Sequence, residues 1–382
     1  MTDNQTTMNK SDRPWKVLIV GGGIGGLSAA IALRNKGFDV HIIEKDPEWT
    51  VYGVGIIQQN NVIRAMHQLG VLDDYVDSGC GFDHVKIFAP NGMEVAKTQI
   101  PALVEGYPAN LGIGRPALQR VLAEKAQSLG SKISLGVTVN EMTDCDTHVD
   151  VSLSDGSQAR YDLVVGADGI YSQTRSTLFP DAPKPEFTGQ AVWRYNFDRP
   201  DDMDGLHVFN GRVGVGLVPM SADKIYMYIT TSEPENPRFE RAELASLMVD
   251  RLAMACPDLH HFSSQITNSD DVVYRPLEWL MLEKDWHIGR VCLLGDAVHS
   301  TTPHLGQGAG LAIEDALVLA EELAEAATPQ EAFKQYRDRR FERCNYIVKQ
   351  SLAICMGQLG KGPLVDNAKA TGESIAIVAQ PI

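Results

Sequence analysis

The stretch KVLIVGGGIGG, residues 16–26, decides the fold of this chain. Its opening residues are almost all apolar, as expected of a strand that is buried on both faces of a parallel sheet. Glycines then follow in a GxGxxG spacing, and a helical pattern occupies residues 27–35. A second apolar strand, residues 40–43, ends at Glu44. Strand, glycine loop, helix, strand and acid together predict a βαβ unit that binds a dinucleotide.

The glycines and the acid of this motif each have a physical role. Gly21 permits the tight turn, and Gly23 lets the backbone approach a pyrophosphate at the positive end of the helix. Gly26 lets the helix pack closely on the strand, and Glu44 accepts hydrogen bonds from a ribose. The alternative interpretation is a structural turn followed by a surface acid. The predicted contacts in this unit are Gly21, Gly23, Gly25, Gly26, Glu44 and Lys45.

Composition and charge restrict the class of protein. The chain has 382 residues, which is long enough for two domains, and its net charge of −15 argues against nucleic acid or an anionic membrane as a partner. No apolar run approaches the ~20 residues that a membrane span needs. The polar first residues lack the apolar core of a signal peptide, so we expect a cytoplasmic protein. Six scattered cysteines without a CxxC pair predict free thiols and no metal site.

Two later motifs extend the dinucleotide site. The first is YDLVVGADG, residues 161–169, followed by Ser172 and Arg175. The second is RVCLLGDAVH, residues 290–299, followed by Pro303 and a GQG triplet. With these motifs the sequence resembles the single-component flavoprotein aromatic hydroxylases of the para-hydroxybenzoate hydroxylase type. The resemblance runs from Lys16 to about Tyr346 and is nearest to hydroxylases of urate, hydroxynicotinate and salicylate.

The resemblance implies FAD as the cofactor and assigns residues to it. Arg115, in the pattern Arg-x-x-Leu, meets the pyrophosphate, and Asp296 contacts the ribityl and pyrophosphate region. The loop at Asp168 takes part in binding both FAD and the nicotinamide cofactor. The helix that begins near residue 309 directs its positive end toward the flavin. The family usually has Asn where this chain has Gly310. Further predicted FAD contacts are Gly55, Val139, Pro303, Gly308 and Ala309.

The resemblance also implies a reaction. NADH or NADPH binds transiently and reduces FAD, since the chain has no second βαβ unit of this kind. O2 then forms a flavin C4a-hydroperoxide, which transfers oxygen to an electron-rich ring. The expected substrate is a small phenolic or hydroxylated N-heteroaromatic compound, and the protein is expected to be a monomer or homodimer.

Three residues are candidates for catalysis. Tyr226 lies in a segment that resembles the urate hydroxylases at an assisting tyrosine, and Arg212 lies near the position of an anion-holding arginine. His304 follows Pro303 and is placed to reach the substrate. Packing within a sheet is the alternative role for Tyr226. Trp193 is expected either to pack in the sheet or to stack on an aromatic substrate.

The fold class expected from these patterns is α/β. A Rossmann-like FAD-binding domain with a parallel sheet carries an inserted antiparallel-sheet substrate domain. The FAD domain comprises residues 16–78, 108–180 and 275–345, and the substrate layer comprises residues 79–107 and 181–274. Residues 1–15 are expected to be a flexible N-terminus, and residues 346–382 a C-terminal segment.

Other functions remain open on the sequence alone. A reductase of the same fold that does not use oxygen is the main alternative. A halogenase is disfavoured because the Trp-x-Trp-x-Ile-Pro signature is absent. A flavin-bearing redox sensor is a third interpretation.

Overall fold

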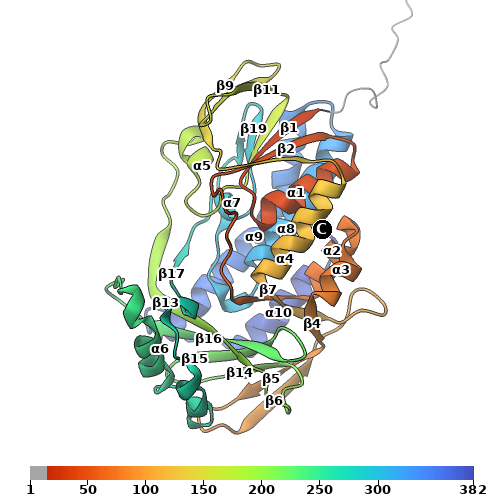
Figure 1. Cartoon of the computed structure of the whole chain (residues 1–382). Coiled ribbons are helices and arrows are strands. Elements are labelled where there is room, and N and C mark those ends of the chain that lie inside the picture. The colour runs from red at the N-terminus through yellow and green to blue at the C-terminus, as the bar shows by residue number, and fades with distance from the viewer. Residues whose placement is uncertain (1–14) are drawn as a thin grey trace, which may run out of the picture.

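The computed structural model describes residues 15–382, so the expected flexible N-terminus lies outside the described residues except for Trp15. Its first sheet has six strands (Figure 1). In spatial order they are β18 (His287–Ile288), β19 (Val291–Leu293), β12 (Leu163–Gly166), β1 (Lys16–Val20), β2 (Asp39–Glu44) and β8 (Lys132–Leu135). All neighbours pair in parallel except β18 and β19. The predicted parallel sheet is thereby confirmed.

The predicted βαβ unit is present at the centre of this sheet. Helix α1 (Ile24–Asn35) connects β1 to β2, and the interior of β1 is fully buried. Gly21 has φ +109°, which glycine adopts without steric cost. A Cβ on Gly26 would lie 2.0 Å from the carbonyl oxygen of Gly21, so only glycine lets α1 approach the turn.

The second sheet has seven strands and carries its own core. In spatial order they are β17 (Val273–Trp279), β13 (Glu186–Asp198), β16 (Lys224–Ser232), β15 (Gly214–Pro219), β14 (Leu206–Phe209), β5 (His84–Phe88) and β6 (Glu94–Gln99). The layer expected to be antiparallel contains one parallel pair, β14 with β5. This pairing joins two chain segments that are far apart in sequence. One face of the sheet packs its apolar side chains against α6 (Leu244–Leu252).

The remaining strands form two three-stranded sheets. One consists of β3 (Gly55–Gln58), β7 (Asn110–Gly114) and β4 (Gly79–Phe82). The other consists of β9 (Val139–Asp144), β10 (Val149–Leu153) and β11 (Gln158–Tyr161). The chain leaves β8 at Gly136, where φ is +71°, and begins the separate strand β9 at Val139.

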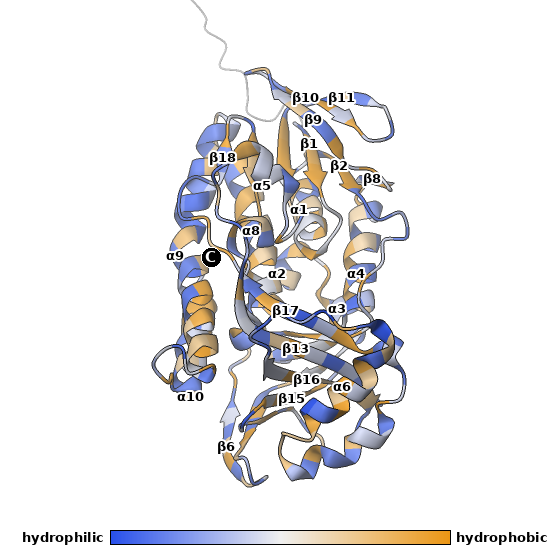
Figure 2. Cartoon of the chain, turned by 90° about the vertical axis from the view of Figure 1, so that its left-hand side faces the viewer, coloured by the Kyte–Doolittle hydropathy of each residue, from blue (hydrophilic) through white to orange (hydrophobic). Residues whose placement is uncertain are grey.

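Helices cover the six-stranded sheet and reach toward the seven-stranded one (Figures 1 and 2). The remaining helices are α2 (Asn60–Leu69), α3 (Leu72–Asp77), α4 (Arg115–Ser128), α5 (Gln173–Leu178), α7 (Asp296–His299), α8 (Gly308–Glu325), α9 (Pro329–Gln358) and α10 (Asn367–Ala379), with 3-10 helices η1 (Arg241–Glu243), η2 (Pro257–Gln265), η3 (Ser269–Asp271) and η4 (Pro303–Leu305). The domain boundary expected at 345/346 falls inside α9. Among the described residues, no helix has both the length and the apolar character that crossing a membrane requires.

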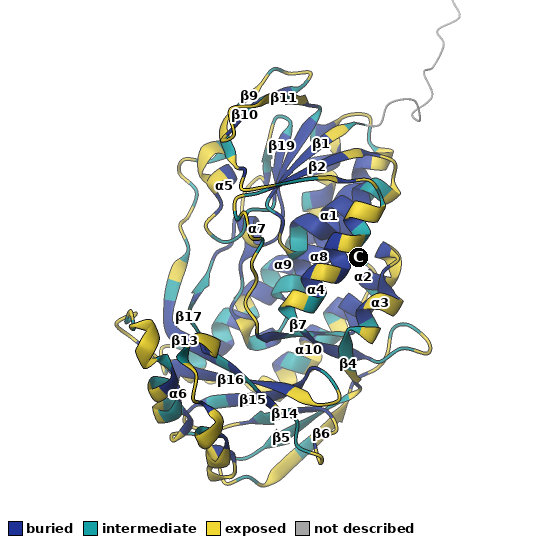
Figure 3. Cartoon of the chain, in the orientation of Figure 1, coloured by how far each residue is buried: buried dark blue, intermediate teal, exposed yellow. Residues whose placement is uncertain are grey.

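A buried ion network joins α8 to α9. Arg340 donates from Nε to Asp315 at 2.8 Å and from Nη1 to Glu314 at 2.8 Å, and all three side chains are at most 1% exposed. The second oxygen of Asp315 accepts from the Gly295 backbone at 3.1 Å and lies 2.6 Å from Nε2 of His299. The network therefore anchors the loop that leads into α7, and Figure 3 shows α8 mostly buried.

The same network reaches the loop before α8. Asn61 Nδ2 donates to Glu314 at 3.0 Å and to Oε1 of Gln307 at 3.1 Å. A Cβ on Gly310 would lie 2.8 Å from that Gln307 oxygen and 3.4 Å from Asn61 Nδ2. The side chains of Asn61 and Gln307 therefore fill the space beside Gly310. This gives a physical reason for the departure from the family's usual Asn.

Replacing Arg340 tests this network. Arg340→Met removes the one described cation that contacts both buried carboxylates, while Glu314 keeps Arg343 at 3.2 Å and Asp315 keeps His299. We therefore expect a loss of about 3 kcal/mol in the free energy of unfolding. Urea unfolding followed by circular dichroism measures it. Lys334→Gln, which breaks the exposed Lys334–Asp338 pair on the same helix, is the control, with an expected loss below about 1 kcal/mol. Equal midpoints for the two variants would contradict the proposed anchor.

Candidate flavin and substrate site

The glycine loop leaves one side of the α1 N-terminus open. A Cβ on Gly23 would meet no atom within 4 Å, whereas Gly21 and Gly26 are tightly enclosed. Gly25 packs toward Leu294 and Ala312 of neighbouring elements. The first N–H groups of a helix have no partner within it and favour an anion. The open face at Gly23 thus fits a diphosphate, as the motif predicts.

Glu44 is oriented by the glycine loop at the end of β2. Its Oε2 accepts from the Gly22 backbone at 2.8 Å, and its Oε1 accepts from the Asp46 backbone at 2.9 Å. Its carboxylate therefore lies beside the open end of α1. The neighbouring Lys45 is exposed, and Val139 packs at the start of β9.

The loop at Asp168 is an internally braced turn. Its carboxylate accepts from Ser172 Oγ at 2.5 Å and from the backbone and hydroxyl of Thr174, each at 3.0 Å. Arg175 donates to the carbonyl of Ala297 at 2.9 Å and to that of Ile170 at 2.8 Å. Arg175 thereby ties this loop to the α7 loop, so the two later sequence motifs are in contact.

Arg115, at the start of α4, and Asp296, at the start of α7, interact electrostatically. Burial among protein atoms lowers the pKa of Arg115 and raises that of Asp296, and each carries a charge that the other feels. Asp296 is surrounded by protein atoms and yet keeps solvent-accessible surface, whereas Gly295 and Ala297 beside it are buried. The Arg115 guanidinium has no hydrogen bond to any residue in 15–382. A cation at the start of α4 and an anion at the start of α7 fit the diphosphate and ribityl chain of FAD.

Tyr226 lies between the seven-stranded sheet and β3. It is 4% exposed, and a Cβ on Gly55 would lie 2.2 Å from its ring, so Gly55 is required by this close approach. Burial raises the pKa of Tyr226, and its hydroxyl lies within hydrogen-bonding reach of the Ile57 backbone. Arg115 acts on it electrostatically. Tyr226 therefore packs in the sheet and also adjoins the flavin-motif arginine.

Arg194 is the residue that the sequence interpretation missed. In the register of β13 and β16 it pairs with Tyr228, and Asn196 pairs with Tyr226. Because side chains alternate along a strand, Arg194 shares a face with these tyrosines, while Trp193 points to the opposite side. Trp193 is fully buried in the core over α6, so packing, not substrate stacking, is its role. In the sequence, aromatic and polar residues alternate from Trp193 to Asp198, and this pattern could have placed Arg194 on the face opposite Trp193.

The other two catalytic candidates do not join this group. Arg212 is exposed in the turn between β14 and β15, at the far end of β15 from the residue that pairs with Tyr226. His304 uses both ring nitrogens, at 3.0 Å from Thr302 Oγ1 and 3.1 Å from Gln358 Oε1. Burial lowers the pKa of His304 to about 4, so its ring is neutral at pH 7.

The remaining predicted FAD contacts lie along the same loop. Pro303 is exposed at the start of η4, and Gly308 and Ala309 form the partly exposed first turn of α8. Gly306, with φ +65°, turns the chain into that helix.

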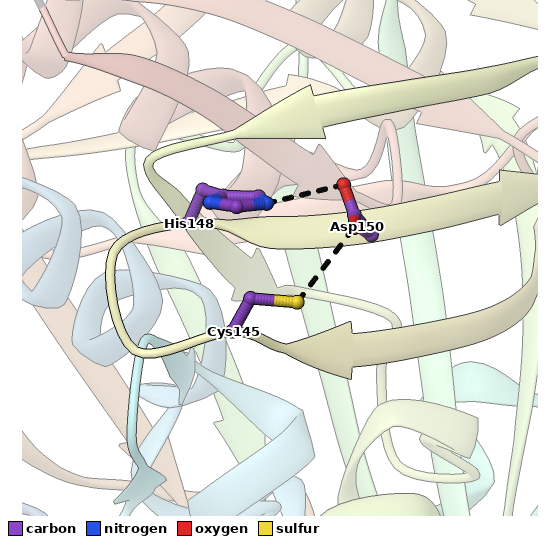
Figure 4. Close-up of side chains that lie close together, drawn as sticks. All are labelled: Cys145, His148 and Asp150. Atoms are coloured by element: carbon purple, nitrogen blue, oxygen red, sulfur yellow. Dashed lines mark hydrogen bonds and ion pairs between the residues drawn. The ribbon is translucent and has the colours of Figure 1, made fainter.

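A separate side-chain cluster lies on the β9–β10 hairpin (Figure 4). Cys145, His148 and Asp150 each offer one ligand atom, all within 4.8 Å of one another. Arg160 Nε donates to Asp150 at 2.9 Å, so this carboxylate already has a cationic partner. Asp150 is therefore shared between Arg160 of β11 and His148, which lies 3.3 Å from it.

Comparison with known proteins agrees with the geometry. Residues 15–351 match a family model described as an FAD binding domain. The putative FAD-dependent monooxygenase YetM of Bacillus subtilis is 31% identical over 373 residues, which are 95% of this chain and 99% of that protein. A 2-heptyl-3-hydroxy-4(1H)-quinolone synthase of Pseudomonas aeruginosa is 32% identical over 363 residues, covering 90% of this chain and 89% of that protein.

A solved structure is similar over most of its length. A variant of Klebsiella pneumoniae HpxO complexed with FAD has a TM-score of 0.82 and 25% identity, covering 96% of this chain and 95% of that one. Together with the match across residues 15–351, this similarity identifies FAD as the cofactor. The chain belongs to the FAD-binding family of flavoprotein aromatic hydroxylases and is a hydroxylating, FAD-dependent monooxygenase.

Proposed function

We propose that this enzyme uses NADH or NADPH and O2 to hydroxylate a small phenolic or hydroxylated N-heteroaromatic compound. Bound FAD supplies the reduction and oxygen-transfer chemistry. The observation that carries the proposal is the meeting of Arg115, from a flavin motif, with Tyr226 and Arg194, from the seven-stranded sheet. Cofactor-facing and sheet-borne polar groups therefore adjoin one another, as transfer of an atom from flavin to substrate requires.

The chain's own residues supply binding and orientation. The phenol of Tyr226, with its raised pKa, stays protonated at neutral pH and acts as a hydrogen-bond donor. The apolar cluster around it, which includes Val218 and Met220, offers a wall suited to a ring. One similar protein is named as a synthase of a 3-hydroxy-4-quinolone, a hydroxylated N-heteroaromatic compound. These observations support the proposed substrate class.

The reaction is tested by product analysis under 18O2. The FAD-loaded enzyme is supplied with NADH or NADPH and a panel of hydroxybenzoates, hydroxypyridines and 4-quinolones. We expect at least one compound to accelerate oxidation of the reductant and to gain one 18O atom, as measured by mass spectrometry. Turnover that proceeds equally without oxygen would instead indicate a reductase, and no labelled product from any compound would refute the proposal.

Glu44 is proposed as the ribose acceptor of FAD. Glu44→Ala removes a charged acceptor that is worth about 1.5–3 kcal/mol, so we expect FAD affinity to fall roughly ten- to a hundred-fold. Fluorescence titration of the apoprotein with FAD measures the affinity. Glu48→Ala, which removes an exposed carboxylate from the following loop, is the control. Equal FAD affinity in the two variants, both folded by circular dichroism, would remove Glu44 from the site.

Tyr226 is proposed to assist the substrate through its hydroxyl. In Tyr226→Phe the ring and its packing remain, so we expect about a two- to ten-fold loss of hydroxylated product per NAD(P)H through loss of one hydrogen bond. The stoichiometry of product to reductant is the measurement. Tyr195→Phe changes a buried tyrosine on the opposite sheet face and serves as the comparison. A loss of the same size in both variants would assign Tyr226 to packing alone.

A further inference from the structure

A cysteine, a histidine and an aspartate converge at the turn between β9 and β10 (Figure 4). Cys145 Sγ lies 3.6 Å from one oxygen of the Asp150 carboxylate, and His148 Nε2 lies 3.3 Å from the other. All three side chains are half-buried, so each is accessible to a small solute. No metal site was expected from the sequence, because it lacks a CxxC pair. The turn supplies Cys-x-x-His-x-Asp instead, and these are three side-chain types that bind zinc in proteins.

The distances within this cluster are close to those of a tetrahedral zinc site. Bonds of about 2.3 Å to sulfur and about 2.0–2.2 Å to nitrogen and oxygen put tetrahedral ligand atoms about 3.3–3.6 Å apart. The contacts of Asp150 with Cys145 and with His148 already have this length. The three ligand atoms all lie within 4.8 Å of one another. Rotation of half-exposed side chains by about 1 Å therefore closes the site around an ion.

The ring of His148 is oriented for coordination through Nε2. Its Nδ1 lies 3.0 Å from Thr147 Oγ1, and when Nδ1 carries the proton it donates to that hydroxyl. The lone pair is then on Nε2, which is enclosed by protein atoms and makes no hydrogen bond with the described residues. A polar partner on the other ring nitrogen is typical of histidines that bind a metal. His148 therefore offers a ligand atom that its surroundings leave unused.

The backbone holds the turn in place before any ion binds. The Cys145 N–H donates to the His148 carbonyl at 2.8 Å. Asp144 accepts from the Asp146 N–H at 3.0 Å and, through its other oxygen, from the Arg290 N–H at 2.7 Å. The turn is thus fixed internally and is tied to the start of β19. Because a preformed turn has little freedom to lose, ion binding costs little entropy here.

Arg160 is the described cation that competes for this carboxylate. Its Nε donates to Asp150 at 2.9 Å, but its side chain is 73% exposed. An exposed ion pair of this kind contributes little to stability, and the arginine can turn into solvent without leaving a buried charge behind. A divalent ion held by three ligands therefore displaces Arg160 from the carboxylate.

We propose that Cys145, His148 and Asp150 form a Zn²⁺ site that stabilises the β9–β10 hairpin, with water as the remaining ligand. Cys145 binds as the thiolate and releases its proton to the solvent. Hard cations such as Mg²⁺ and Ca²⁺ prefer oxygen ligands and do not compete. Figure 1 places this hairpin at the opposite end of the molecule from the seven-stranded sheet. The site is therefore separate from the proposed hydroxylation and independent of it.

Equilibrium dialysis of the FAD-loaded enzyme against buffered micromolar Zn²⁺ tests the proposal, with bound metal measured by mass spectrometry. We expect one Zn²⁺ per chain, retained in an excess of Mg²⁺. Cys145→Ser and His148→Gln each weaken binding at least about ten-fold, because each removes a ligand. Arg160→Gln removes the competitor and strengthens binding about two- to five-fold. Zn²⁺ also raises the thermal unfolding midpoint of wild type and not that of Cys145→Ser.

Two variants serve as matched controls. Cys80→Ser changes the other half-exposed cysteine of the described residues, and His260→Gln changes an exposed histidine that has a histidine neighbour. Both are expected to bind Zn²⁺ as wild type does. Less than one Zn²⁺ per wild-type chain, wild-type affinity in both ligand variants, or displacement of Zn²⁺ by Mg²⁺ would overturn the proposal. Retention of FAD at wild-type stoichiometry shows that each variant is folded.

Discussion

The buried contact between Arg340 and the pair Glu314–Asp315 is the constraint on which the flavin-facing loops depend. A charge enclosed without water must be paired, and here one guanidinium satisfies two adjacent carboxylates. Asp315 then has an oxygen left for Gly295, and Glu314 has one for Asn61. Two loops that approach the cofactor from different parts of the chain are thus held by one network. The geometry of these loops therefore depends on the buried ion pairs of Arg340 with Glu314 and Asp315.

The second organising feature is the two-faced seven-stranded sheet. Alternation along β13 sends Trp193 into an apolar core and Arg194 toward the flavin residues. The same alternation on β16 gives one face to Met227 and the other to Tyr226 and Tyr228. A register shift of one residue would exchange these sets. The chemistry of the substrate face is therefore set by the packing of the opposite face.

The three-stranded sheet of β3, β7 and β4 approaches the seven-stranded sheet closely, and this explains two glycines that no motif explains. Gly55 lies against the ring of Tyr226, and Gly112 would place a Cβ 1.9 Å from the Pro219 carbonyl oxygen. These contacts bring the β3–β7 sheet onto the substrate layer. Gly55 was predicted as a cofactor contact, and the structure gives a steric reason for its identity, the ring of Tyr226.

The sequence alone determined the βαβ unit, the order of the flavin motifs and the family, because these depend on local periodicity and on glycines at short spacing. It also indicated Arg115, Asp296 and Tyr226, which carry recognisable local patterns. Only the tertiary structure separated Arg194 from Arg212, since both are isolated arginines in strand-rich sequence. Their difference lies in strand register and in the partners that surround them. Burial and charge balance arise from residues distant in the chain, and no local pattern encodes them.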